Sequence, residues 1–194
     1  MRVGFREGRA EDRARKNWDG NGPRPLTWAA WYPVADAEVE QALVAGPPGA
    51  PWFLLGRAAR NAPLAAMERS YPVVLLSHGT GGMALGLEWL GRRLAQQGFI
   101  ALAVNHHGNT GLEPYRPEGF LCLWERAPDL SVLLDVMESQ GEFADRLEMD
   151  RVFVGGFSAG AYTAAALLGL RTDGLVPLAP GSFIVGHRAR VPAC

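Results

Sequence analysis

From about residue 71 the sequence alternates short apolar runs with segments of helical periodicity. Apolar runs of this length are typical of strands buried on both faces of a sheet, and the segments between them are long enough for crossover helices. This alternation constrains the fold strongly, because right-handed crossovers build a mostly parallel sheet with helices on both faces. We therefore predict an α/β fold. The predicted strands are VVLLS (73–77), FIALAV (99–104), RVFVGG (151–156) and GLVPLA (174–179), and the predicted helices are 87–98, 128–140 and 158–170.

The first seventy residues lack this pattern. Residues 1–24 are polar and rich in Arg, Gly and Asn, which predicts an N-terminal arm, extending to about residue 25, or a loose first strand. The aromatic run LTWAAWYPV (26–34) ends at a proline and predicts a strand. Residues 35–70 hold several Pro, Gly and Ala and predict a long, partly helical excursion. With 194 residues, 48% hydrophobic and 20% charged, the chain suits one globular domain spanning 1–194.

Composition excludes several classes of partner. The net charge of −1 gives no reason to expect binding to nucleic acid or to an anionic membrane. The apolar runs fall far short of the roughly 20 residues that span a bilayer, so we expect no membrane span. The N-terminus lacks the apolar core of a signal peptide, and the chain as given is expected to stay in the cytoplasm. Cys122 and Cys194 match no metal or redox spacing, so we expect free thiols, no metal site and no organic cofactor.

The strongest motif is GFSAG at 156–160, which matches G-x-S-x-G. It follows a predicted strand and opens a predicted helix, which is the context that a serine nucleophile on a sharp turn requires. The flanking glycines let Ser158 occupy a strained turn without a steric clash. The helix that follows aims its N–H groups at the site, which favours a developing anion. The simpler alternative is a serine that caps an ordinary strand-to-helix turn.

A second motif, SHGTGG at 77–82, directly follows the first buried strand. Ligands in open α/β sheets bind at the carboxyl ends of the strands, so this loop and Ser158 are expected to share one edge. The backbone N–H groups of Thr80 and Ala159 are our candidates for an oxyanion hole. We expect His78, Gly79, His106 and His107 to shape the pocket beside them.

With these motifs, the chain resembles the α/β-hydrolases of the dienelactone-hydrolase-like and platelet-activating-factor-acetylhydrolase branch. The resemblance runs from about residue 3 to about residue 170. It is carried by GPRPLTWAAWYP (22–33), YPVVLLSHGTGG (71–82), LAQQGFIALAVNHHGNT (94–110), WERAPDLSVLLD (124–135) and VFVGGFSAGAYTAAALLG (152–169). The family loop after the second buried strand usually reads His-Pro-Gly-Asn, whereas this chain has His106-His107-Gly108-Asn109.

The resemblance implies a serine carboxylic-ester hydrolase that forms an acyl-enzyme on Ser158, without a cofactor. It implies a small-molecule ester or lactone as substrate. It also implies that the last strands and the triad-histidine region are missing, because the family places that histidine well downstream. A sheet without its last strands exposes an apolar edge, which favours self-association.

The triad partners are the weakest part of the pattern. Triad order in this fold is Ser, acid, His, and His187 is the one histidine that follows Ser158, so it is our candidate base. Asp173 lies between Ser158 and His187 in the sequence, as the triad acid should, but it precedes the predicted strand 174–179. Six strand residues of about 3.3 Å each then separate it from the active edge. Two alternatives stay open: an inactive hydrolase fragment that serves as a binding module, and an acyltransferase on the same scaffold.

Overall fold

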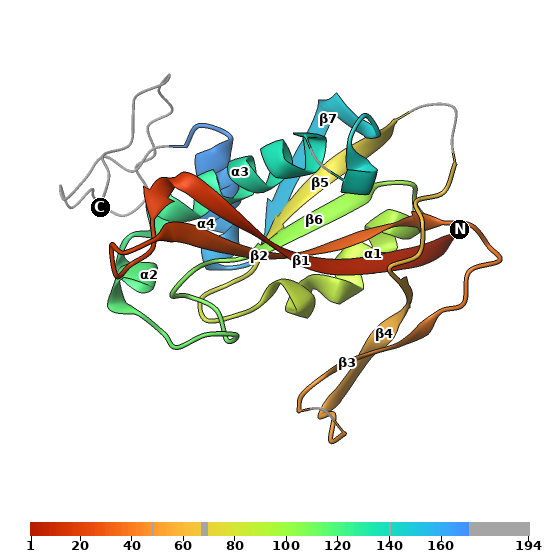
Figure 1. The fold of residues 1–194 in the computed structure, drawn as a ribbon, viewed down its shortest axis with the longest axis horizontal. Helices are drawn as coiled ribbons and strands as arrows, with labels where there is room; N and C mark the ends of the chain where they lie inside the picture. The colour runs from red at the N-terminus through yellow and green to blue at the C-terminus, as the bar shows by residue number, and fades with distance from the viewer. Residues whose placement is uncertain (48, 67–69, 140, 171–194) are drawn as a thin grey trace.

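The structure is a computed structural model that describes residues 1–170, apart from 48, 67–69 and 140. This part of the chain forms a seven-stranded sheet with helices on both faces (Figure 1). The strands are β1 (Arg2–Lys16), β2 (Pro23–Val34), β3 (Gln41–Ala45), β4 (Phe53–Arg60), β5 (Tyr71–Ser77), β6 (Ile100–Asn105) and β7 (Leu147–Gly156). The α-helices are α1 (Glu88–Gln96), α2 (Pro117–Leu121), α3 (Arg126–Ser139) and α4 (Ala159–Leu167). Short 3₁₀ turns are η1 (Ala84–Leu87), η2 (Leu123–Glu125) and η3 (Gly141–Phe143).

The α/β fold is confirmed, and its sheet is mixed, with the order β3-β4-β1-β2-β6-β5-β7. The strands that the alternating pattern predicts are parallel: β5 pairs with β6 on one side and with β7 on the other. The earlier strands add antiparallel pairs, β1 with β2, β2 with β6 and β3 with β4. Hairpin connections explain the pairs β1–β2 and β3–β4, since consecutive antiparallel neighbours need no crossover helix.

Of the two alternatives for the N-terminal residues, the structure shows the strand. Residues 2–16 form a 15-residue strand that pairs with β2 along almost its whole length. The prediction for the next segment is wrong. Residues 35–70 contain no described helix and instead hold the hairpin β3–β4, whose turn lies in the Gly- and Pro-rich stretch 46–52. The predicted strand 174–179 lies outside the described residues.

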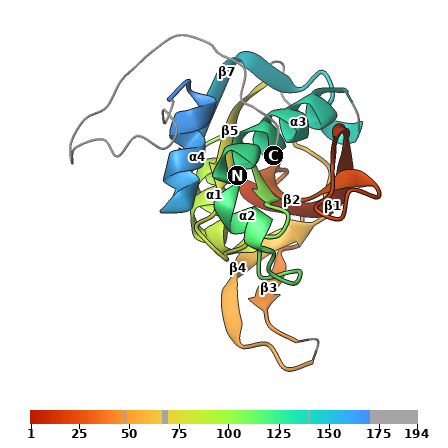
Figure 2. The ribbon, with the colours of Figure 1, turned by 90° about the vertical axis from the view of Figure 1, so that its left-hand side faces the viewer.

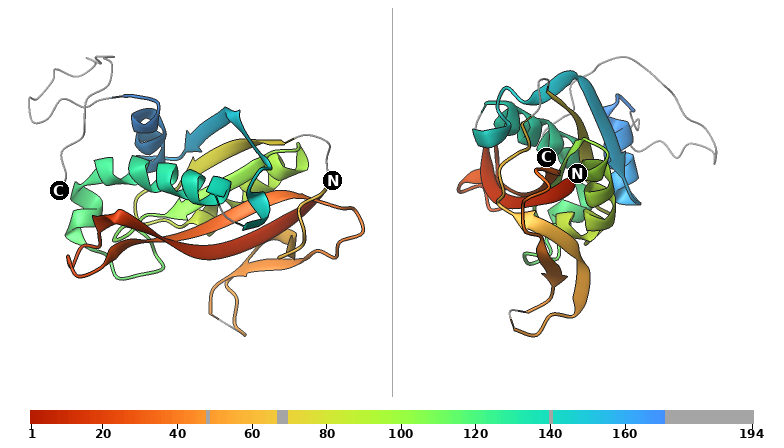
Figure 3. Two further views of the ribbon diagram at one scale, coloured as in Figure 1. Left: turned by 45° about the horizontal axis from the view of Figure 1, so that its top comes forward. Right: turned by 90° about the vertical axis from the view of Figure 1, so that its right-hand side faces the viewer.

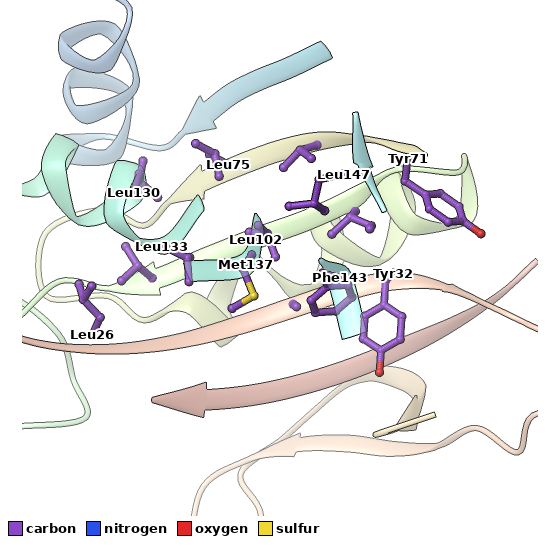
Figure 4. Packing of buried hydrophobic residues seen from close by; sticks show 14 of the residues in the cluster. Leu26, Tyr32, Tyr71, Leu75, Leu102, Leu130, Leu133, Met137, Phe143 and Leu147 are labelled. Carbon is purple, nitrogen blue, oxygen red and sulfur yellow. The ribbon is translucent and has the colours of Figure 1, made fainter. Parts of the chain in front are cut away.

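Two apolar layers hold the helices on the sheet. On one face α3 places Leu130, Leu133 and Met137 against the sheet residues Leu75 and Leu102 (Figure 4). Helix α4 packs on the same side, where it contacts α3, β5 and β7. On the other face α1 contributes Ala95 and the half-buried Leu90 and Leu94. Figure 2 shows the helices on either side of the sheet.

This architecture brings three loops to one edge. The register pairs Ser77 with Gly156 and Ser77 with Val104, so β5, β6 and β7 end side by side. The loops that follow them carry the oxyanion-loop motif, the pair His106-His107 and Ser158. The sheet order ends at β7, whose outer edge pairs with no described strand, and self-association there stays a prediction.

Two further sequence expectations bear on this part of the chain. Within residues 1–170 as described, no helix is long and apolar enough to cross a membrane. Cys122 is disulfide-bonded, so the expectation of a free thiol is wrong at this position. The second cysteine, Cys194, lies outside the described residues.

Candidate active site

Ser158 sits on a strained turn between β7 and α4. Its φ of 54° and ψ of −120° place a non-glycine residue in a region that L-amino acids rarely occupy. The turn is held by the Gly160 N–H, which donates to the Phe157 carbonyl at 2.8 Å, and by the Ala161 N–H, which donates to the Ser158 carbonyl at 2.8 Å. The Ser158 residue is exposed to solvent. Strained backbone of this kind persists where the surrounding structure holds it in place, and it is frequent at functional sites.

The two motif glycines are required because the backbone passes too close for a side chain. A Cβ on Gly156 would lie 2.2 Å from the Gly160 carbonyl oxygen, and a Cβ on Gly160 would lie 1.9 Å from the Ser77 carbonyl oxygen. Both obstacles are backbone atoms, which cannot rotate away. The glycines therefore let the first turn of α4 press against the end of β5, as the motif predicted.

The loop after β5 lies directly against Ser158. A Cβ on Gly79 would be 3.4 Å from the Ser158 Cβ and 3.3 Å from the Phe157 carbonyl oxygen. The loop is fixed by the Gly81 N–H, which donates to Asn109 Oδ1 at 2.6 Å, and by the Tyr115 hydroxyl, which donates to the Gly81 carbonyl at 3.0 Å.

The predicted oxyanion donors occupy the two sides of this contact. Ala159 is the first residue of α4, so its N–H has no intrahelical acceptor. Thr80 is exposed in the loop, and its N–H has no acceptor among the described residues. These are the properties that an anion-binding N–H needs.

His106 lies at the centre of a buried polar network. Its Nδ1 is 2.9 Å from Asp129 Oδ2 and its Nε2 is 2.9 Å from the Ser77 hydroxyl. Asp129 also accepts from Arg24 Nε at 2.7 Å and from Arg15 at 2.7 Å. His106, Asp129 and Ser77 are all fully buried. Although they have the residue types of a Ser-His-Asp triad, they lie in the interior, where no substrate reaches them.

The protonation of this network follows from its hydrogen bonds. Burial lowers the pKa of His106 to about 4, although the hydrogen bond to Asp129 acts in the opposite direction. Burial by itself would raise the pKa of Asp129. The hydrogen bond from His106 and the charge of Arg24 outweigh that effect and hold the pKa well below its usual range. His106 is therefore neutral: its Nδ1–H donates to Asp129, and its Nε2 accepts from Ser77.

Arg126 connects this network to both halves of the candidate site. Its guanidinium donates to the His78 carbonyl, to Thr163 Oγ1 at 3.0 Å and to the Ser77 hydroxyl at 3.3 Å. Thr163 in turn donates to the Ala159 carbonyl at 2.9 Å. Burial lowers the pKa of Arg126 to about 10, so it stays a cation at neutral pH. One buried side chain thus links the oxyanion loop to the first turn of α4.

The other two described histidines are also engaged. His78 Nδ1 contacts the Gly79 carbonyl at 2.7 Å, and His78 Nε2 accepts from the His106 N–H at 3.2 Å. Burial lowers the pKa of His78 to about 3, with His106 as a further cause. His107 contacts Glu113 through Nδ1 at 2.9 Å and stacks on Trp18. No described histidine is hydrogen-bonded to Ser158, and the candidate base His187 lies outside the described residues.

Sequence reasoning missed Asp129, Arg126 and Arg24. Their signal is indirect. Arg126 and Asp129 are spaced three apart on α3, so they share a helix face, and Arg24 follows the turn that opens β2. Nothing local shows that these residues meet behind the strand ends.

Among the described residues, no cluster of three or more His, Cys, Asp or Glu side chains is arranged to hold a metal. A hollow of about 770 Å³ lies beside the β1–β2 pair, away from Ser158; it is lined by Arg9, Ala10, Glu11, Pro25, Leu26, Thr27, Thr110, Leu112 and Glu113.

Part of this arrangement lies in a stretch that is similar to a known protein family. The family of platelet-activating factor acetylhydrolase, isoform II, matches residues 55–117. This stretch includes β5, the oxyanion loop and β6. Over this stretch the chain is similar to that family.

The chain is also similar to curated relatives and to a solved structure. The chain is similar to the cutinase est1 of Thermobifida alba, at 30% identity over 117 residues, which is 58% of this chain and 36% of the cutinase. Cutinase 2 of Thermobifida cellulosilytica is also 30% identical and is covered to 41%. A ferulic acid esterase from Streptomyces cinnamoneus has the same fold, with a TM-score of 0.69 and 24% identity, covering 86% of this chain and 55% of that one. The chain thus spans from about a third to about half of the length of these proteins.

Proposed function

We propose that the protein is a serine carboxylic-ester hydrolase that acts through an acyl-enzyme on Ser158. The observation that carries this proposal is the strained, exposed Ser158 at a strand-to-helix turn, with the oxyanion loop packed against it at Gly79. A serine in this geometry presents its hydroxyl to a bound carbonyl group, and backbone N–H groups on either side can hold the resulting negative charge.

The proposed steps balance as follows. Ser158 Oγ attacks the ester carbon while a base takes its proton, and the carbonyl oxygen becomes an oxyanion that accepts from the N–H groups of Thr80 and Ala159. The C–O bond to the leaving alcohol then breaks, and the base returns the proton to that alcohol. Water repeats the sequence on the acyl-enzyme and releases the acid. We propose His187 as the base.

The proposed substrate is a small-molecule ester or lactone. The names of the similar proteins support an ester: platelet-activating factor acetylhydrolase, cutinase and ferulic acid esterase. The family resemblance supports short-chain or oxidised acyl groups. The half-exposed Trp124 and the exposed Phe157 lie on segments next to the site and are candidates for contact with the acyl chain.

A second candidate is an inactive scaffold or binding module with the same fold. One observation favours it: His78, His106 and His107 all make other contacts, and none of them is hydrogen-bonded to Ser158 among the described residues. An oxyanion hole alone can leave weak turnover, so slow hydrolysis would not separate the two candidates. The pH profile would, because a working base with a pKa near 7 gives a rise in kcat/KM through that range.

The experiment is labelling of the folded chain with a fluorophosphonate probe, with Ser158→Ala as control and circular dichroism to verify folding. We expect labelling of the parent chain and none of the variant. His187→Ala should then abolish labelling if His187 is the base. A folded chain that resists the probe would instead support the inactive scaffold.

A further inference from the structure

The hairpin β3–β4 carries the most exposed apolar segment of the described chain. It projects from the body of the molecule, away from the helices (Figures 1 and 3). Near its tip the consecutive residues Trp52, Phe53 and Leu54 are 72%, 64% and 70% exposed, and Val44 on the facing strand is 41% exposed. Three consecutive large apolar side chains in water are unusual for a monomeric protein surface.

Strand geometry shows that packing within the chain does not explain this segment. The register pairs Val44 with Leu54 and Ala45 with Phe53, so Leu54 and Phe53 point to opposite faces of the hairpin. Both faces are therefore apolar and solvated at the tip. The base is different: Leu43 and Ala58 are buried in the core layer that includes Phe5 and Trp31.

The base also fixes the hairpin to the body. β4 pairs with β1 through Gly4 and Phe5, and Arg57 donates to the Glu40 carbonyl at 2.9 Å. The tip is thus presented on an anchored stem, with the Trp52 N–H donating to the Ala45 carbonyl at 2.9 Å to close the turn. Such an arrangement holds the apolar side chains away from the rest of the protein.

Charge points to the kind of surface that this tip fits. Residues 41–56 contain no charged side chain, and the flanking residues Glu40 and Arg57 carry opposite charges. An anionic membrane or an acidic or basic protein would offer the tip no electrostatic attraction. Aromatic side chains followed by aliphatic ones are instead typical of segments that enter the boundary between water and an apolar phase.

The size of the patch argues against a protein partner. A large apolar side chain buries roughly 150–250 Å² when fully covered. Three such side chains, already partly covered, supply about half of the roughly 800 Å² per partner that a stable protein interface buries. A lipid surface has no such threshold, because each inserted side chain contributes independently.

We propose that the β3–β4 tip inserts Trp52, Phe53 and Leu54 into the interface of zwitterionic lipid. β3 is the outermost strand of the described sheet, and its unpaired backbone groups cannot enter hydrocarbon. Insertion is therefore shallow and limited to the tip. The proposal goes beyond ester hydrolysis and does not depend on Ser158; it would bring the chain to surfaces where poorly soluble esters collect.

The test is co-sedimentation of the full chain with phosphatidylcholine vesicles. We expect binding that changes little between low and high salt, since no charge takes part. The triple variant Trp52→Ser, Phe53→Ser, Leu54→Ser should lower the partition coefficient at least tenfold. The matched control is Trp89→Ser with Leu121→Ser, two residues that are 62% and 73% exposed elsewhere on the surface, and it should bind like the parent chain.

Three outcomes would overturn the proposal. The parent chain could fail to bind the vesicles, the triple variant could bind as well as the parent, or binding could require anionic lipid. A parent dimer that only the triple variant dissociates, without vesicle binding, would assign the tip to a second copy of the chain. Circular dichroism verifies that each variant is folded. Ser158→Ala should bind vesicles normally, which separates this proposal from the proposed chemistry.

Discussion

Gly160→Ala tests how closely the nucleophile turn is packed against the sheet. Gly160 is the second residue of α4, where helix propensity alone predicts that alanine stabilises the protein by about 1 kcal/mol. The structure predicts the opposite sign. The added Cβ would lie 1.9 Å from the Ser77 carbonyl oxygen, 2.6 Å from its carbon and 2.9 Å from the His78 carbonyl oxygen.

The expected loss of stability depends on whether these atoms can move away from the added Cβ. All three belong to the backbone at the end of β5, so the helix must retreat by about 1 Å to restore a normal contact. Overpacking of this kind typically costs about 1–3 kcal/mol, and a rigid obstacle places the cost at the upper end, even after the gain in helix propensity. A displacement of about 1 Å at a reacting group can lower its rate about 100-fold.

The assay combines urea unfolding, followed by circular dichroism, with the rate of fluorophosphonate labelling of Ser158. We expect Gly160→Ala to lower the free energy of unfolding by about 2–3 kcal/mol and the labelling rate by about 100-fold. The matched control is Gly86→Ala in η1, where the nearest atom to the added Cβ is Met83 Cγ at 3.9 Å, and we expect little change. A Gly160→Ala protein at least as stable as the parent, with normal labelling, would refute the reasoning.

Three further predictions concern the buried network. Folded pKa values of about 3 for His78 and about 4 for His106 lie below the unfolded value near 6.5, so between pH 6 and 4 the unfolded chain binds more protons than the folded chain, at most two. The free energy of unfolding from urea titrations should be level well above pH 7 and fall by about 2 kcal/mol per pH unit in that window, because the extra protons of the unfolded chain favour unfolding as the pH falls. A flat profile would contradict buried neutral imidazoles. Asp129→Asn leaves the buried Arg24 guanidinium without its carboxylate, so the free energy of unfolding at pH 7 should fall by about 3–5 kcal/mol in the same assay. A decrease of less than about 1 kcal/mol would count against the network. Arg126→Lys keeps the positive charge but loses the several donors of the guanidinium group. We expect the labelling of Ser158 to slow at least tenfold, mainly in the chemical step rather than in probe binding, with an unchanged circular dichroism spectrum. An unchanged labelling rate would show that Arg126 does not position the site.

The sequence predicts the parallel strands β5, β6 and β7 well, because their apolar runs match their places in the sheet. The predicted strands 73–77 and 151–156 lie within β5 and β7, and the predicted strand 99–104 overlaps β6 from residue 100 onward. β5 and β6 are buried almost throughout, and strands buried on both faces must be apolar along their length. β1 has no such apolar run, since only a few of its residues are apolar and most of its side chains reach solvent. It is a strand because β2 lies beside it, and local propensity cannot show that. The β3–β4 hairpin was readable from the Gly- and Pro-rich stretch 46–51 between two apolar runs, which is a turn signal rather than a helical one.

The histidines show why the site itself was only partly predictable. A general base for Ser158 needs a ring nitrogen free to accept the serine proton and a pKa near the working pH. The position of His106 at the end of a strand suggests such a role, but its two nitrogens are used by Asp129 and Ser77, and burial lowers its pKa to about 4. His78 is excluded in the same way by its contacts and by its lowered pKa of about 3. Both rings instead brace the loop that faces Ser158, because His78 joins that loop to His106. No described histidine is hydrogen-bonded to Ser158, so His187, which lies outside the described residues, stays the proposed base.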